Sequence, residues 1–207
     1  MPNQWVVEAA TAVDTSSLAN LLLASAPSML SHVLGNGDTA ITVGYLNYSL
    51  AASGGQYGYQ NHSIIKQGQK IIGIASAWHD QLPESFDKIT VESLHHFFGI
   101  EACVQIFKRS AALALDIQKP TSQQLVIGHL STLSDYQRRG VASAFIQHFY
   151  EQAKFLGKPE IIVDVEKQNQ NALQCYLKLG FQPLSCEVRD RYIRLSKPVI
   201  VDAAPSQ

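Results

Sequence analysis

The sequence has few cysteines and no long apolar run. Its three cysteines show neither the paired spacing of a disulfide framework nor the spacing of a metal site, so a reducing compartment fits best and we expect a cytoplasmic protein. No apolar stretch reaches the roughly 18 residues that a membrane-spanning helix needs, so we expect no membrane partner. The stretch 18–26 lacks the basic start of a signal peptide, and we interpret it as a buried helix.

Basic residues are absent from the first 65 residues of the chain. No Lys or Arg occurs before Lys66, whereas Glu8, Asp14 and Asp38 all precede it. The whole chain carries a formal charge of -1, unlike the strong basic excess of nucleic-acid-binding proteins, so we expect no nucleic-acid partner. Basic groups for an anionic ligand therefore belong to the later part of the sequence.

Hydrophobic periodicity predicts one mixed α/β domain over residues 1–197, followed by a tail at 198–207. With 46% hydrophobic residues the chain can bury a sizeable core, and no Pro/Gly/Ser-rich linker divides it. Strands are expected at 5–10, 58–66, 69–78, 125–132, 161–166, 184–188 and 191–195. Helices are expected at 18–26, from 38 to 54, within a helical insert at 83–120, and at 140–156 and 171–179.

The most informative segment is 125–143, where a strand leads through a short turn into a helix. The first N–H groups of a helix have no partner within it, and the helix dipole adds about half a positive charge there. Gly140 lets the backbone approach a bulky phosphate, while Arg138 and Arg139 add positive charge. The segment lacks the G-x-x-x-x-G-K-[ST] and G-x-G-x-x-G patterns, so nothing supports an ATP-hydrolysing P-loop or a dinucleotide-binding fold.

Two sequence blocks follow one another at a fixed distance in the last third of the chain. The first is a Gln-x-x-Gly-x-Ala loop made by Gln137, Gly140 and Ala142. The second is an Asn-x-x-Ala-x-x-x-Tyr-x-x-x-Gly-Phe pattern made by Asn169, Ala172, Tyr176, Gly180 and Phe181. Together they resemble the coenzyme loop and the following helix of the GNAT superfamily of N-acetyltransferases. The resemblance covers about 125–184. It implies a twisted mixed sheet of about seven strands, flanked by helices and splayed between the fourth and fifth strands, with the pantetheine arm of the coenzyme in the gap.

The resemblance also implies which residues bind acetyl-CoA as the co-substrate. The main chain of the fourth strand would align the pantetheine, the loop would hold the pyrophosphate, and an Asn would bind the coenzyme arm. These residues are Leu130, Ser131 and Thr132 on the strand, Gln137, Arg138, Arg139, Gly140, Val141, Ala142 and Ser143 in the loop, and Asn169. The chain departs from the family in having Ala142 where many members have Gly, and Leu130-Ser131-Thr132 where the family has Leu-x-Val.

The proton-transfer residues are also carried over from the resemblance. Tyr176 would give a proton to the departing thiolate; the alternative is a half-buried aromatic of the core. Some members carry a catalytic Glu five residues before the motif Asn, and here that position is Asp164. Glu166 and His129 are alternative proton acceptors for the amine, so the general base stays open.

The sequence therefore predicts an acetyltransferase that moves the acetyl group of acetyl-CoA directly to a primary amine of a small molecule or peptide. The alternative is a non-catalytic acyl-CoA-binding or regulatory module with the same fold. The early helices and the insert at 83–120 would surround the acceptor, and the scarcity of Lys and Arg before residue 66 favours a neutral or cationic one. No metal is implied. An exposed strand near the C-terminus could pair across a homodimer.

Overall fold

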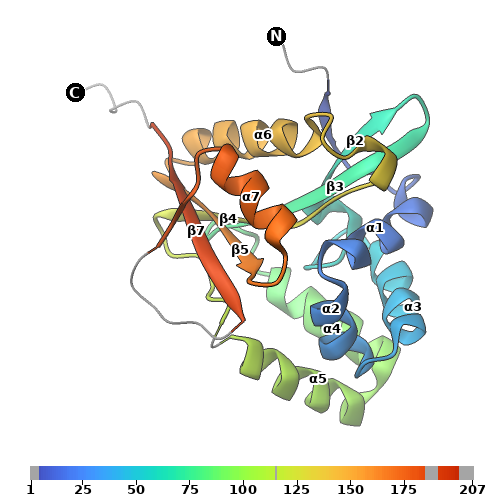
Figure 1. Ribbon diagram of the computed structural model, residues 1–207. Helices are drawn as coiled ribbons and strands as arrows, with labels where there is room; N and C mark the ends of the chain where they lie inside the picture. Colours follow the sequence, from blue (N-terminus) through green and yellow to red (C-terminus); the bar gives the residue numbers. More distant parts are fainter. Residues whose placement is uncertain (1–4, 115, 185–190, 201–207) are drawn as a thin grey trace.

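Seven strands form one mixed sheet in the order β1-β2-β3-β4-β5-β7-β6 (Figure 1). This computed structural model describes residues 5–114, 116–184 and 191–200. The strands are β1 Val7–Ala9, β2 His62–Gln67, β3 Lys70–Trp78, β4 Gln124–Thr132, β5 Glu160–Glu166, β6 Gln182–Pro183 and β7 Tyr192–Pro198. Only β4 and β5 run parallel, and every other neighbouring pair is antiparallel. The predicted mixed α/β fold with about seven strands is confirmed.

Helices cover both faces of the sheet (Figure 1). They are α1 Leu18–Ser25, α2 Pro27–Gly35, α3 Thr39–Leu50, α4 Phe86–Phe98, α5 Ile100–Leu113, α6 Val141–Phe155 and α7 Gln170–Lys178. One hydrophobic core joins α1 to α5 with the sheet, and a second core joins α6 and α7 with its other face. Strand β4 therefore lies between two separately packed layers.

The parallel pair β4 and β5 separates part-way along its length. The register runs from Gln124 opposite Glu160 to Ile127 opposite Val163 and ends there. Both strands continue, β4 as far as Thr132 and β5 as far as Glu166. The sheet is thus splayed between its fourth and fifth strands, as the sequence predicted.

Helix α2 and the break between α4 and α5 differ from the sequence expectations. The chain bends at Ala26, and Pro27 starts a new helix because its fixed φ and missing N–H suit a first helical position. Gly99, at φ 78°, divides the predicted insert into two helices. The helix expected after Asp38 is present, with the Asp38 carboxylate accepting from two backbone N–H groups of its first turn.

Part of one expected strand cannot be compared with the structure. The strand predicted at 184–188 falls mostly outside the described residues, whereas β6 and β7 lie on either side of that gap. Among the residues the structure describes, no single helix is long and apolar enough to cross a membrane. One pair, Thr15–Ser25 with Pro27–Gly35, passes the length and composition test only when joined, and it is bent by 107°.

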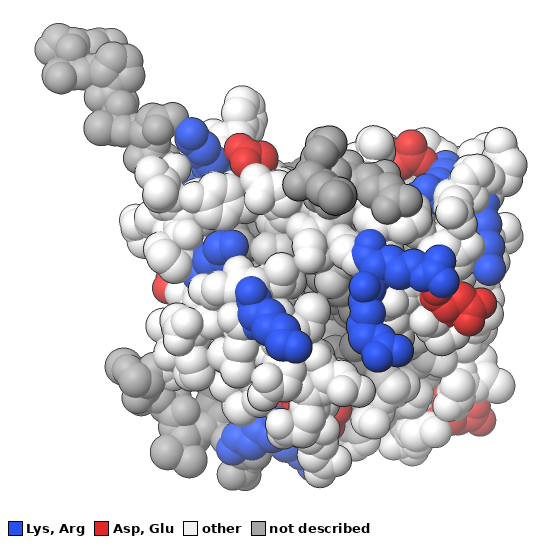
Figure 2. Space-filling view, turned by 45° about the horizontal axis from the view of Figure 1, so that its top comes forward, with Lys and Arg blue, Asp and Glu red and all other residues white. Residues whose placement is uncertain are grey.

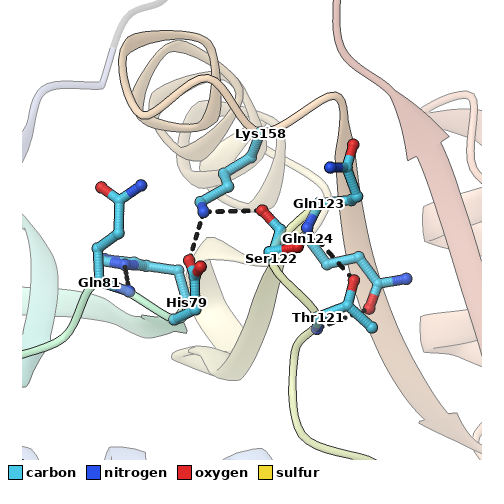
Figure 3. A network of polar contacts seen from close by, with 8 residues as sticks. His79, Gln81, Thr121, Ser122, Gln123, Gln124 and Lys158 are labelled. Carbon is cyan, nitrogen blue, oxygen red and sulfur yellow. Dashed lines mark hydrogen bonds and ion pairs between the residues drawn. The ribbon is translucent and has the colours of Figure 1, made fainter.

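A buried lysine fastens the two ends of the segment that contains α4 and α5 (Figure 3). Lys158, which is 2% exposed in the turn before β5, pairs with the carboxylate of Asp80 and donates to the backbone carbonyl of Ser122 at 2.9 Å. Asp80 follows β3 and Ser122 precedes β4, and the lysine hydrogen bond lowers the pKa of the Asp80 carboxyl. The helical segment is therefore held at its base, while α4 packs against α3 and α5 packs against α2.

Candidate active site

The segment between β4 and α6 folds into a loop with two left-handed residues. Arg138 has φ 59° and Gly140 has φ 85°, which turns the backbone sharply into the first turn of α6. A Cβ added to Gly140 would meet no atom within 4 Å, so the surface above this glycine is open. The positive φ favours glycine here, and the open space leaves the backbone accessible to a bulky ligand.

The first turn of α6 presents unused hydrogen-bond donors. The first bond of the helix is donated by Ala144 N to Gly140 O, at 3.0 Å. Among the described residues, the preceding N–H groups of Val141, Ala142 and Ser143 have no acceptor. They lie at the positive end of the helix dipole, so the geometry suits a phosphate or diphosphate.

Tyr136 and Trp5 fix the shape of this loop. The Tyr136 hydroxyl donates to Gln67 Oε1 at 2.6 Å, and Trp5 Nε1 donates to the carbonyl of Arg139 at 2.7 Å. The Arg139 guanidinium lies 5.4 Å from the centre of the Tyr136 ring, a cation–π distance. Figure 2 shows several basic side chains and few acidic ones on the face that carries α6. The loop is therefore a preformed, positively charged surface.

A bulge in β4 frees main-chain groups beside the loop. The register with β3 pairs Ser76 with Gly128 and then Ile74 with Ser131, so β4 has one extra residue and His129 takes φ 49°. The pairing with β5 has already ended at Ile127. In the part of the chain that the structure describes, His129 and Leu130 have no residue in register opposite them on β3, and no partner on β5. Such groups can align an amide-containing arm and polarise a carbonyl.

A cavity of about 550 Å³ lies between α1, the start of β3 and the end of β4. It brings together Ser131, Thr132 and Gln137, three of the predicted coenzyme-binding residues. The remaining lining residues are Ser17, Asn20, Leu21, Ala24, Gln69, Lys70, Ile71, Leu133 and Ser134. Tyr176 and Asn169 are not among them, so the cavity gathers the strand and loop positions but not those of α7.

Helix α7 carries the second sequence block. Asn169 is its N-cap, and its side-chain oxygen accepts from Ala172 N at 3.1 Å, which leaves the exposed amide nitrogen available for a ligand. Tyr176 is half-buried and packs edge-on against Phe181, with ring centres 5.5 Å apart. Burial raises the pKa of Tyr176 well above its usual value, so the phenol keeps its proton at neutral pH.

The family follows from the comparison with known sequences. The model of the acetyltransferase (GNAT) family matches residues 54–181, which is more than half of the chain. The protein belongs to the GNAT acetyltransferase family. The match spans the loop at 137–143, the β4 bulge and α7, so both sequence blocks lie within it. No curated protein matches the sequence.

Solved acetyltransferases share this GNAT fold over nearly the whole chain. A crystal structure described as an acetyltransferase is 20% identical, covers 94% of this chain and 100% of its own, and has a TM-score of 0.62. An N-acetyltransferase from Staphylococcus aureus Mu50 is 17% identical, with coverage of 93% and 100% and a TM-score of 0.69. A putative acetyltransferase from Salmonella typhimurium, solved with its cofactor acetyl-CoA, is 12% identical, with coverage of 98% of each chain and a TM-score of 0.50. At these identities the likeness concerns the fold alone.

Within this GNAT fold, Asp164 faces an arginine across the sheet. It lies opposite Arg194 of β7, with Asp164 Oδ1 3.2 Å from Arg194 Nε, and each side chain is 6% exposed. Arg194 also donates to the side chain and the carbonyl of Gln118. An adjacent guanidinium stabilises the ionised carboxylate and weakens it as a proton acceptor. The geometry favours a structural role for Asp164.

His129 also lies in a confined environment. The bulge turns it toward α1, where its Nδ1 is 3.4 Å from Ser25 Oγ and its ring centre lies 5.1 Å from that of Trp78 and 5.8 Å from that of Tyr57. Burial, helped by the neighbouring His62, lowers the pKa of His129 to about 3. An imidazole with this pKa is a weak proton acceptor at neutral pH, although it remains a hydrogen-bonding group.

Residues that sequence reasoning missed contact the loop between β4 and α6. Trp5, Gln67 and Lys70 all reach the loop from the first 70 residues of the chain. Strand topology is the signal that connects these residues with the loop. Strand β3 runs antiparallel to β4, so the turn at Gly68 places the start of β3 beside the end of β4. Without the strand pairing, nothing in the spacing of these residues connects them with 137–143.

Proposed function

We propose that this GNAT protein transfers the acetyl group of acetyl-CoA to a primary amine of a small molecule or peptide by direct transfer. The observation that carries the proposal is the open α6 N-terminus with its left-handed Gly140, set beside the unpaired backbone of the β4 bulge. This arrangement offers donors for a diphosphate at one end and for a thioester carbonyl at the other.

Each part of the site has a proposed role in binding or transfer. Residues Gln137 to Ser143 hold the diphosphate, the main chain at Leu130 to Thr132 aligns the pantetheine, and Asn169 binds the coenzyme arm through its amide nitrogen. The neutral amine attacks the thioester carbon, so an N–C bond forms and the C–S bond breaks. Tyr176 protonates the departing thiolate, and the proton of the amine leaves through water or a nearby base. The α1 to α5 layer shapes the acceptor site.

The alternative is a module that binds acyl-CoA without transferring the acyl group. Such a module would keep the phosphate loop and have no need for a protonated phenol behind it. The presence of Tyr176 at this position of the motif supports the enzyme. We also propose a cytoplasmic location, which the free thiols of Cys103 and Cys175 support.

A thermal-shift experiment tests coenzyme binding directly. Acetyl-CoA at about 100 times its dissociation constant adds roughly 2.7 kcal/mol of stability, which raises the melting temperature by several degrees. ATP and NAD should give no comparable shift. Equal shifts with all three ligands, or none with acetyl-CoA, would contradict the proposal.

A pair of glycine variants locates the binding site on the loop. Gly140→Glu places an anion where the diphosphate is proposed to bind, so it should abolish the acetyl-CoA shift. Gly157→Glu is the matched control, because Gly157 also has a positive φ and open space around its Cβ but lies beyond the opposite end of α6. If both folded variants bind acetyl-CoA with wild-type affinity, the loop is misassigned. Release of free coenzyme thiol across a panel of polyamines, aminoglycosides, amino acids and peptides then identifies the acceptor.

A further inference from the structure

Lys70 occupies a position beside the coenzyme loop that the loop sequence does not reveal. It is the first residue of β3, directly after the turn at Gly68, and its side chain lines the cavity next to β4. Its Nζ lies 5.4 Å from the centre of the Tyr136 ring. Lys70 is the one charged residue among the described residues that line this cavity. The hairpin β2–β3 therefore brings a cation to the coenzyme loop.

Tyr136 connects this cation with the loop arginine. Its ring contacts Lys70 and Arg139 at the same distance of 5.4 Å, and its hydroxyl donates to Gln67 at the end of β2. Trp5 packs edge-on against the same ring, with centres 6.4 Å apart. These contacts restrict the ring, and through the cation–π attraction they favour the positions of both cations.

The charges around the loop favour an anionic ligand. Three exposed cations, Lys70, Arg138 and Arg139, surround a segment whose exposed acidic residue is Asp135. A lysine ammonium is a compact donor that binds phosphate as a point charge, whereas the N–H groups of α6 provide directed hydrogen bonds. A phosphate bound at the α6 N-terminus thus lies in a field to which β3 contributes.

We propose that Lys70 is a phosphate-binding residue for the coenzyme, held in position by Tyr136. The ligand group is one of the coenzyme's phosphates, either the diphosphate or the 3′-phosphate. This inference rests on the proposed function, because it presupposes that the loop binds acetyl-CoA. It extends that function to a residue on a different strand and gives Tyr136 a positioning role.

Calorimetric titration of Lys70→Ala with three ligands tests the proposal. Coenzyme A should bind about tenfold more weakly than to the wild type, the size expected for losing one charge-assisted contact. Pantetheine, which has no phosphate, should bind both proteins equally. If Lys70→Ala binds both coenzyme A and its 3′-dephospho form more weakly than the wild type does, Lys70 contacts the diphosphate. If only the affinity for coenzyme A falls, Lys70 contacts the 3′-phosphate.

Three further variants separate this role from a general effect of charge or folding. Lys88→Ala removes the same charge from α4, away from the loop and cavity, and should leave coenzyme affinity unchanged. Lys70→Arg should retain most of the affinity, and Tyr136→Leu should reproduce part of the Lys70→Ala loss. Wild-type affinity in Lys70→Ala, or an equal loss with pantetheine, would overturn the proposal. A wild-type protein that binds no coenzyme at all would instead refute the proposed function.

Discussion

Local contacts at the C-terminal end of α7 fix the position of Tyr176. The carbonyl of Tyr176 accepts from Phe181 N at 3.1 Å, and the two rings pack edge-on, so the tyrosine and the Gly180 turn position each other. Burial raises the pKa of the phenol, which is protonated at neutral pH even at its usual value of about 10. The spacing of the motif predicted this helix and turn from the sequence, because every contact involved is local.

Tyr176→Phe keeps the ring packing and removes the hydroxyl. If Tyr176 protonates the thiolate, turnover should fall by about ten- to a thousandfold while acetyl-CoA affinity changes little, because the loss occurs in the transition state. Steady-state kinetics and titration with the coenzyme measure the two quantities. Tyr150→Phe on α6 is the control and should leave turnover near wild type. Full turnover in Tyr176→Phe, with chemistry rate-limiting, would remove the proton-donor assignment.

Asp164→Asn distinguishes a structural carboxylate from a catalytic one. The variant removes the carboxylate charge that lies against the buried Arg194, so we expect the free energy of unfolding to fall by about 3 kcal/mol. Denaturant unfolding measures this change. Asp87→Asn, which removes an exposed partner of Lys119, should change stability by less than about 1 kcal/mol. A fully stable Asp164→Asn variant with a large loss of turnover and a flattened pH–rate profile would instead identify Asp164 as the base.

At the scale of elements, the β4 bulge determines which side chains face the α1 layer. Leu125 and Ile127 belong to the α6 core, and regular alternation would place His129 on that same face. The extra residue shifts the alternation, so His129 contacts Ser25 and Trp78 instead. A bulge depends on the pairing with a strand about fifty residues away, and the sequence of β4 alone does not predict it.

Elements that depend on local sequence signals were predicted, whereas contacts that depend on strand pairing were not. The loop at 137–143, α6 and α7 follow from local signals: a glycine, a helix N-terminus and an asparagine cap. The Lys70 contact and the Asp164–Arg194 pair depend on strand pairing, so spacing alone could not reveal them. Helix α2 had a local signal in Pro27, which the sequence interpretation did not use.

Gly128→Ala tests the packing at the bulge. A Cβ at this position would lie 2.4 Å from Trp78 Cζ3, so the indole ring or the strand must shift. We expect the free energy of unfolding to fall by about 1–3 kcal/mol, the usual cost of overpacking. Gly44→Ala in α3 is the control, because its Cβ would lie 3.5 Å from Phe97 in ordinary contact. A Gly128→Ala variant as stable as the wild type would show that the Trp78 ring moves without cost.

At the scale of the whole molecule, the sheet separates two layers with different chemistry. The α6 face carries the loop at 137–143 and an apolar core, whereas the α1 to α5 face covers the buried histidine rings of β2 and β4. His62 and His129 have ring centres 6.4 Å apart there, and His62 Nδ1 is 2.6 Å from Ser76 Oγ. The Nε2 atoms of both histidines are buried and have no hydrogen-bond partner among the described residues. Neither ring has a charged partner within this described cluster, so both are expected to stay neutral.

The buried histidine pair makes stability depend on pH in a defined direction. Burial lowers the pKa of His62 to about 4 and that of His129 to about 3, whereas an unfolded histidine titrates near 6.5. Between these values the unfolded state binds more protons, so stability is full above about pH 6.5 and is lost as the pH falls toward 4 and 3. At pH 5.5 each histidine should lower the free energy of unfolding by about 1 kcal/mol relative to pH 7.5.

Urea unfolding of the wild type and two variants at pH 7.5 and 5.5 measures this dependence. His129→Asn suits the left-handed backbone at φ 49° and removes one titrating ring, so it should lose about 1 kcal/mol less than the wild type between the two pH values. His96→Asn removes an exposed ring of α4 and should keep the wild-type pH dependence. Carboxylates contribute little to this difference because their unfolded pKa values lie near 4, below the measured range. If His129→Asn and the wild type lose the same free energy of unfolding between the two pH values, the His129 ring is solvated or charged in the folded protein. The interpretation of His62 and His129 as a buried, neutral pair would then be wrong.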